Sequence, residues 1–303
     1  MTPGVLWHIT KRALAGWWND NVPRLGASLS YYTLFAMAPV IIIAIGIAGL
    51  FFGPEAVRGE IVGQIRDLMG DQGARAVQSM LEGVSKPSDS RIATAVGLFT
   101  FFIGATGAFL ELQTALNGIW RVKPKEDGKW WKELVVQRLI SFGLVIAVGF
   151  LLLVSLVVSA GLTALNRYMG AAFPGLTEVW NAGNLLVSFG VVTLLFALVY
   201  RVLPDVKLLW RDVWLGAVVT AGLFTVGKTL IGLYLGTSGI ASTYGAAGSV
   251  VVLLVWVYYS AQILFLGAEF TQVYANRYGW RIRPSPGAET VKECERAEQG
   301  IPR

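Results

Sequence analysis

Six long apolar stretches alternate with polar segments along the chain. They cover, in order, Ser28–Phe52, Ile92–Leu116, Leu139–Leu162, Leu185–Leu203, Val213–Leu235 and Ala246–Val273. Each has about the 20 residues that an α-helix needs to cross roughly 30 Å of hydrocarbon. Because a backbone in lipid must satisfy its own hydrogen bonds, the stretches are expected to be helical. The pattern predicts an all-α, polytopic membrane protein with six transmembrane helices.

Composition and charge agree with this prediction. The chain is 54% hydrophobic and 15% charged, whereas soluble proteins carry about 25% charged residues. The segment between the second and third spans has six Lys and Arg residues, and the segment between the fifth and sixth has none. By the positive-inside rule, both termini are predicted to be cytoplasmic. The net charge of +6 is therefore interpreted as a topology signal with some attraction to anionic lipid headgroups, and no nucleic-acid partner is expected.

Three regions are predicted from these boundaries. Residues 1–27 are expected to form a cytoplasmic, amphipathic arm on the membrane surface. Residues 28–273 are expected to form the six-helix domain, and residues 274–303 are expected to form a basic cytoplasmic tail. Apolar residues in the first outside loop, residues 53–91, follow helical spacing in two parts, which predicts two short amphipathic helices. Two interpretations of this pair remain open, a lid or docking surface for an envelope protein and a packed cap without a direct role.

Ionisable side chains inside the apolar stretches are candidates for function because they are costly in hydrocarbon. They are Glu111, Lys228 and Glu269. At a helix rise of about 1.5 Å per residue, Lys228 and Glu269 lie about 16 Å apart along the membrane normal, too far for a direct ion pair. Lys228 is therefore expected to reach Gln262 or to extend outward toward the headgroups.

The two glutamates are predicted to line a cavity that opens to the cytoplasm. Asn117, Arg24 and Arg138 are their candidate partners. The alternative for each glutamate is a structural ion pair at the membrane interface.

Two further segments suggest a substrate path. Polar residues, among them Tyr31 and Tyr32, begin the first span, and Pro39 follows them. Because proline removes a backbone hydrogen bond, a kink is expected there, either as a hinge or pocket or as a packing feature. Residues 236–249, which include Tyr244, are uncharged and mostly small or hydroxylated. Close helix packing is the preferred interpretation, and irregular backbone around a cavity is the alternative.

An aromatic–Arg–β-branched–x–Pro pattern occurs three times at a spacing of 80 residues. It comprises Trp120–Pro124, Tyr200–Pro204 and Trp280–Pro284. One interpretation is a membrane boundary, with the aromatic residue at the interface and proline ending the helix. The other is a repeat of three two-helix hairpins.

Several motifs together resemble the YihY/BrkB family of bacterial inner-membrane proteins, formerly labelled ribonuclease BN. They are residues 25–35 with Pro39, residues 115–120, residues 244–249, residues 256–260 and residues 267–269. The resemblance covers residues 17–274 and implies a bacterial inner-membrane protein linked to envelope integrity and, in some members, to export of lipid A precursors. With His8 as its single histidine and scattered acidic residues, the chain does not fit a metal-dependent nuclease, and no enzyme activity, metal or cofactor is expected.

The function favoured by these features is a transporter or flippase for lipids or lipid-linked envelope precursors. The alternatives are an ion- or proton-coupled solute transporter and a scaffold that organises envelope proteins through the outside loop. The expected partners are membrane lipids and, through the outside loop, envelope proteins; the sequence leaves the oligomeric state open.

Overall fold

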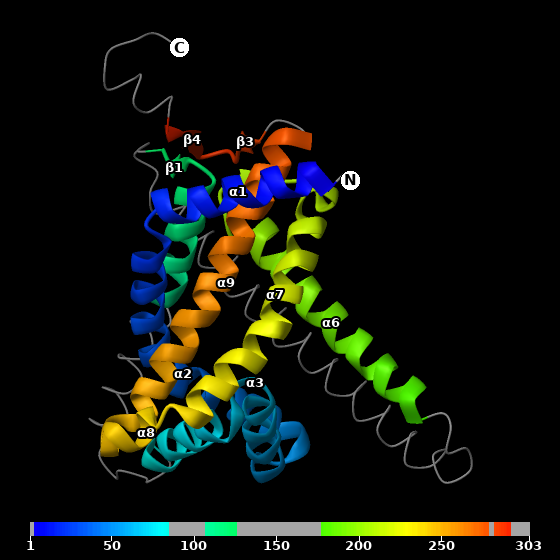
Figure 1. Cartoon of the computed structure of the whole chain (residues 1–303). Helices are drawn as coiled ribbons and strands as arrows, with labels where there is room; N and C mark the ends of the chain where they lie inside the picture. Colours follow the sequence, from blue (N-terminus) through cyan, green and yellow to red (C-terminus); the bar gives the residue numbers. More distant parts are fainter. Residues whose placement is uncertain (1–2, 85–106, 126–176, 279–281, 292–303) are drawn as a thin grey trace. The chain divides into compact units, whose positions relative to one another are not determined.

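The computed structural model describes residues 3–84, 107–125, 177–278 and 282–291, which are mostly helical (Figure 1). The helices are α1 (Pro3–Asn19), α2 (Val22–Phe52), α3 (Pro54–Val84), an unlabelled helix at residues 107–119, α6 (Thr177–Val202), α7 (Trp210–Thr237), α8 (Ile240–Thr243), the 3-10 turn η2 (Gly245–Ala247) and α9 (Gly248–Tyr278). The short strands are β1 (Val122–Pro124), β2 (Val206–Lys207), β3 (Arg283–Pro284) and β4 (Ala288–Thr290).

Among the described residues, three helices are long and apolar enough to cross a membrane. They are Leu185–Val202 within α6, all of α7 and all of α9, and they match the predicted fourth, fifth and sixth spans. Helix α2 covers the first predicted span and is helical throughout. The predicted span at residues 139–162, and most of that at residues 92–116, lie outside the described residues. The six-span count and the cytoplasmic location of the termini stay predictions.

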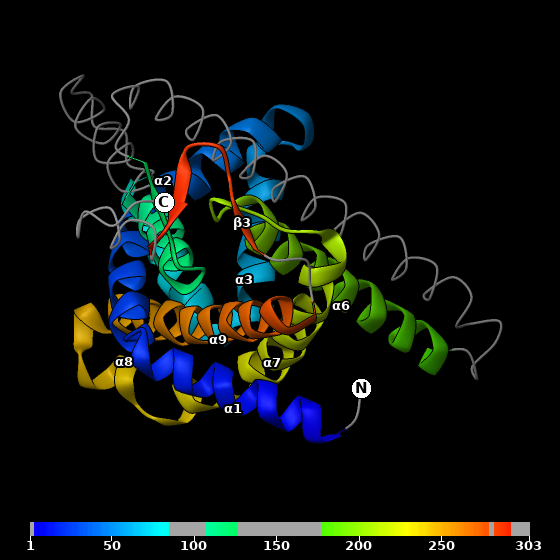
Figure 2. The same cartoon turned by 90° about the horizontal axis from the view of Figure 1, so that it is seen from above.

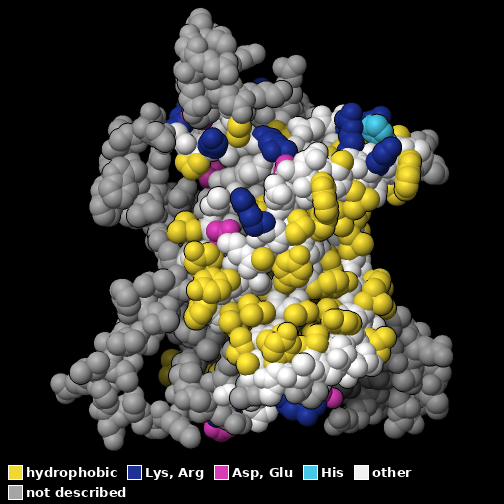
Figure 3. Space-filling model, turned by 60° about the vertical axis from the view of Figure 1, so that its left-hand side comes forward, with side chains coloured by type: hydrophobic (Ala, Val, Ile, Leu, Met, Phe, Trp, Pro, Cys, Tyr) yellow, Lys and Arg dark blue, Asp and Glu magenta, His cyan; other side chains and the backbone are white. Residues whose placement is uncertain are grey.

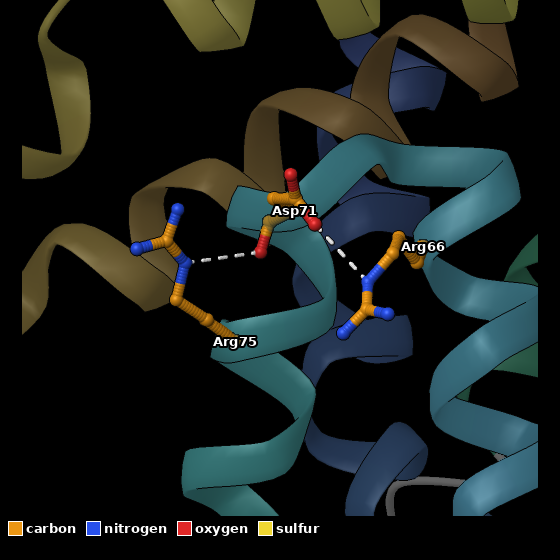
Figure 4. A network of polar contacts seen from close by, with 3 residues as sticks. All are labelled: Arg66, Asp71 and Arg75. Carbon is orange, nitrogen blue, oxygen red and sulfur yellow. Dashed lines mark hydrogen bonds and ion pairs between the residues drawn. The ribbon is translucent and has the colours of Figure 1, made fainter.

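Helix α3 consists of two helical segments that meet at Gly70. This glycine has φ 74° and ψ −179°, a conformation that glycine adopts without steric cost. Beside the break, Arg66 Nε lies 3.0 Å from Asp71 Oδ1, and Arg75 Nε donates to the Asp71 carbonyl at 3.3 Å (Figure 4). The Arg66–Asp71 pair is largely exposed and contributes little to stability. That these segments form short helices on the outer membrane face stays a prediction.

The chain divides into two compact units that are interleaved in sequence. The first comprises Met1–Gly16, Leu116–Leu223 and Leu266–Arg303, and the second comprises Trp17–Ala115 and Phe224–Phe265. In the second unit, Ile45 of α2, Val77 and Leu81 of α3 and Leu253 of α9 form one buried cluster. Hydrophobic burial among these three helices therefore holds the second unit together.

In the first unit, α1 is an amphipathic helix packed on α7 and α9. Ile9 and Ala13 are buried against Phe270 of α9, with Leu215 and Val219 of α7 beside them. Figure 1 shows α1 passing in front of the last turns of α9, and Figure 2 shows the two helices beside one another. Helix α1 also exposes large apolar side chains, including Leu6, Trp7 and Leu14. Basic side chains lie next to hydrophobic ones around the single histidine (Figure 3), a combination typical of a helix at a membrane surface.

The short strands join the C-terminal segment to two loops of the first unit. Strand β1 pairs with β4, with Val122 opposite Thr290, and β2 pairs with β3, with Val206 opposite Pro284. The repeated aromatic–Arg–β-branched–x–Pro pattern ends in β1 at its first occurrence, just before β2 at its second and in β3 at its third. All three occurrences therefore lie at or beside these pairings, whereas a repeat of two-helix hairpins stays a prediction.

Candidate functional site

Helix α9 presents two polar side chains, Gln262 and Glu269, from one face. They lie seven residues apart, which is about two helical turns, so their side chains project in nearly the same direction. Glu269 is only 3% exposed, and both side-chain amide atoms of Gln262 are buried. Because α9 is apolar enough to span a membrane, each of the two side chains is a candidate functional position, Gln262 within the second unit and Glu269 within the first.

In the first unit, the Glu269 carboxyl group lies against the backbone of α1 at Gly16. A methyl group added at Gly16 would collide with Glu269 Oε2 and lie 2.9 Å from Cδ. The absence of a side chain at Gly16 therefore makes room for the carboxyl group. A buried carboxyl group is costly in an apolar environment unless it is paired or protonated, which marks Glu269 as a candidate for binding or proton transfer.

In the second unit, the Gln262 amide occupies the space beside Gly26 of α2. A methyl group at Gly26 would collide with Gln262 Nε2 and lie 3.3 Å from Cδ. Among the described residues, neither Nε2 nor Oε1 of Gln262 has a hydrogen-bond partner. Each buried group without a partner costs about 1–3 kcal/mol, and the amide is free to bind a ligand.

The expected contact between Lys228 and Gln262 is wrong. Lys228 is half-buried on α7, and the Gln262 amide accepts no hydrogen bond from it. The other expectation, that Lys228 extends outward toward the headgroups, stays a prediction. Glu111 is half-buried on the helix at residues 107–119 and belongs to the second unit, whereas Glu269 belongs to the first. A cavity shared by the two glutamates stays a prediction.

Asn117 pairs with a loop residue instead of the glutamates. Its Nδ2 donates to Asp205 Oδ2 at 2.7 Å, and the backbone N–H of Asp205 donates to Asn117 Oδ1 at 2.8 Å. Asn117 is 7% exposed, and these two bonds use both ends of its amide. The expectation that Asn117 partners a glutamate is therefore corrected: it joins the helix at residues 107–119 to the loop after α6.

The aromatic candidates of α2 differ in their surroundings. The Tyr32 ring packs on Gly107, where a methyl group would lie 2.8 Å from ring atom Cε1. Tyr31 is 57% exposed, and its ring meets that of Phe35 edge-to-face with centroids 5.0 Å apart. Helix α2 continues through Pro39 without a break in helical geometry, so a functional kink stays a prediction.

Tyr244 lies between two single turns, α8 and η2, and is 56% exposed. Residues 243 and 245 are exposed as well. The close helix packing preferred for this segment is therefore wrong at these three positions, because they form surface turns. A backbone that lines a cavity in this segment stays a prediction.

A buried hydroxyl network, which sequence reasoning missed, supports the part of α9 that carries Glu269. Tyr200 of α6 and Thr220 of α7 are fully buried, with their oxygens 3.0 Å apart. Thr220 also donates to the Gly216 carbonyl at 2.7 Å, and Thr271 of α9 donates to the Gly267 carbonyl at 2.7 Å. The only sequence signal was the repeated aromatic pattern. The Tyr200 side chain is enclosed in protein, and the position of the pattern at the membrane boundary stays a prediction.

Glycines bring α7 and α9 close together around this network. A methyl group at Gly267 would lie 2.9 Å from Thr220 Cβ, and one at Gly216 would lie 3.2 Å from Thr271 Cα. Small residues at helix contacts permit such close backbone approach in membranes. In the described ranges, no group of three or more His, Cys, Asp or Glu side chains is arranged to hold a metal ion.

Comparison with known proteins gives a consistent picture. The family model described as "Virulence factor BrkB" matches residues 13–291. A UPF0761 membrane protein of Pseudomonas aeruginosa is 28% identical over 270 residues, covering 88% of this chain and 62% of the relative. A UPF0761 membrane protein of Ralstonia nicotianae is 26% identical over 276 residues, covering 89% and 60%, and one of Alteromonas mediterranea is 28% identical over 255 residues, covering 83% and 82%.

The chain thus spans about three fifths of the length of the first two of these relatives. No solved structure matches it. The match to residues 13–291 extends beyond the recognised motifs and takes in all four short strands.

Proposed function

This chain belongs to the BrkB family of membrane proteins, and from that premise we propose that it transports or flips lipids or lipid-linked envelope precursors. The observation that carries the proposal is a pair of buried polar groups on the apolar helix α9. They are the Glu269 side chain and the amide of Gln262. Polar side chains at such positions typically mark a substrate or ion pathway.

The spacing of the two groups suits the polar headgroup of a lipid. Two helical turns separate Gln262 from Glu269 by about 10 Å along α9. A headgroup moving along α9 would meet an amide that lacks a protein partner and then a carboxyl group beside Gly16. The acyl chains would remain in the surrounding hydrocarbon, where they need no polar contacts.

We further propose that the protein lies in the bacterial inner membrane with both termini in the cytoplasm. The support is the excess of Lys and Arg in alternate connecting segments. Accessibility of single cysteines, introduced at residue 2 and within residues 85–91 of a Cys294→Ser variant, tests this orientation. Labelling of residue 2 from outside intact spheroplasts would contradict it.

The burial of Glu269 supports one second candidate, an ion- or proton-coupled solute transporter. A carboxyl group that is 3% exposed can alternate between a charged and a protonated form as its surroundings change. A proton flux that depends on the purified protein and on Glu269 would favour this function.

The deciding experiment measures movement of fluorescent phospholipid between the leaflets of proteoliposomes that contain the purified full chain. Protein-dependent movement is expected, and Glu269→Gln is expected to slow it because the amide cannot carry the charge or the proton. Glu60→Gln is the matched control, since Glu60 is exposed on α3 and the chemical change is the same. Folded protein that moves no lipid, or equal rates in all three proteins, would argue against the proposal.

A further inference from the structure

In Figure 1, α7 follows α6 and the intervening loop. A shallow apolar groove with an arginine lies at the start of α7. Its lining residues are Trp210, Arg211, Trp214, Leu215 and Val218. Trp210 and Trp214 are 45% and 47% exposed. Because α7 is a candidate membrane span that begins at Trp210, the groove starts at the end of the span, where headgroups meet the acyl chains.

The aromatic end of the groove is held in place by α6. The Arg201 guanidinium lies 4.7 Å from the centroid of the Trp210 ring and donates a hydrogen bond to the Leu208 carbonyl. A cation over an aromatic face is attractive, and the hydrogen bond fixes the loop just before Trp210. Arg201 is therefore engaged in positioning the tryptophan, and its charge is directed to the ring and the loop.

Arg211 is the basic group that remains for a ligand. It is exposed and makes neither a salt bridge nor a hydrogen bond within the part of the chain that the structure describes. The neighbouring carboxylate, Asp212, is only 4% exposed and does not line the groove. A cation without a counterion at the mouth of an apolar groove complements a ligand that joins an anionic group to a hydrocarbon chain.

The direction of the groove fits such a ligand. Trp210, Trp214 and Val218 follow one another at four-residue intervals, so they form a stripe about 12 Å long along α7. Arg211 stands at the end where α7 begins, and Leu215 and Val218 continue into the apolar part of the helix. A phosphate bound to Arg211 would leave one acyl chain lying along the stripe.

We propose that this groove is a binding site for an anionic phospholipid, with the headgroup phosphate on Arg211 and an acyl chain along Trp214 and Val218. The site does not depend on the transport function proposed above. Binding is an equilibrium property, and a protein that moves no lipid between leaflets can still possess it.

The test is native mass spectrometry of the full chain, released from detergent micelles that contain phosphatidylglycerol or phosphatidylcholine. The wild type is expected to retain phosphatidylglycerol in preference to phosphatidylcholine. Arg211→Gln should weaken phosphatidylglycerol binding roughly fivefold, the factor that corresponds to about 1 kcal/mol for a basic residue at an anionic lipid surface. Arg211→Lys should keep most of the binding because it keeps the charge.

Two further variants separate this site from general attraction to basic surface. Arg283→Gln removes the same charge from an exposed position in β3 and should leave phosphatidylglycerol binding unchanged. Val218→Trp should fill the groove and weaken binding of both lipids. Equal binding by wild type and Arg211→Gln, an equal loss in Arg283→Gln, or full binding by Val218→Trp would each overturn the proposal.

Discussion

The carboxyl group of Glu269 lies directly against the backbone of Gly16, so that α1 covers a buried acid on α9. The contact is confined to the first unit of the fold, where Ile9 and Ala13 hold α1 in place. Besides the predicted position of α1 at the membrane surface, the contact means that any outward movement of α1 would uncover Glu269.

Gly16→Ala is expected to destabilise the packing of α1. The added methyl group would lie 2.9 Å from Glu269 Cδ, and overpacking of this kind typically costs about 1–3 kcal/mol. Thermal unfolding in detergent should show a lower midpoint, and limited proteolysis should cut α1 faster than in the wild type. Gly4→Ala is the control within the same helix, because nothing lies within 4 Å of its added methyl group. Equal midpoints for the two variants would contradict the close contact.

Gln262→Leu is expected to stabilise the protein while slowing the proposed lipid movement. The substitution removes two buried polar atoms that have no hydrogen-bond partner among the described residues, and each such atom costs about 1–3 kcal/mol. A substrate contact kept at the expense of stability is a common feature of functional sites. Thermal unfolding and the proteoliposome assay measure the two effects separately. A lower unfolding midpoint would show that the amide has a stabilising partner.

The sequence predicted the helices better than it predicted the contacts. Apolar length alone identified the spans that correspond to α6, α7 and α9, because a helix in lipid needs about 20 apolar residues whatever it packs against. The same reasoning selected Gln262 and Glu269, since polar groups stand out in an apolar stretch. It could not show that each faces a glycine of another helix, because such a contact depends on three-dimensional packing.

Contacts between distant residues could not be predicted from the sequence. The aromatic pattern singled out Tyr200 as a boundary residue, but it gave no sign that the Tyr200 hydroxyl group is buried beside Thr220. Asn117 was one of three candidate partners of the glutamates, whereas its partner in the structure, Asp205, is 88 residues away in sequence. Long-range pairings of this kind leave no periodic signal in a single sequence.

Gly216→Ala is expected to separate α7 from α9. The methyl group would lie 3.2 Å from Thr271 Cα, and backbone cannot move aside as a flexible side chain can. The variant should lose about 1–3 kcal/mol of stability, seen as a lower midpoint of unfolding in detergent. Gly222→Ala, on the same helix with nothing within 4 Å of the new methyl group, should be neutral or stabilising because alanine favours helices. Equal losses in both variants would mean that general helix effects, and not the contact, explain the result.

Exchanging Asn117 and Asp205 gives the sharpest test of the fold. These two residues join the helix at residues 107–119 to the loop after α6. Asn117→Asp replaces the amide nitrogen that lies 2.7 Å from Asp205 Oδ2 with a carboxylate oxygen. Repulsion between the two carboxylates should lower the unfolding midpoint markedly. Asp205→Asn alone should have a smaller effect, because Asn117 can still donate to the new amide oxygen. In the double variant, the carboxylate at 117 accepts from the amide at 205 and from the backbone N–H that now binds Asn117 Oδ1. The double variant should therefore recover most of the stability lost in Asn117→Asp, and strictly additive losses would show that the two side chains do not interact.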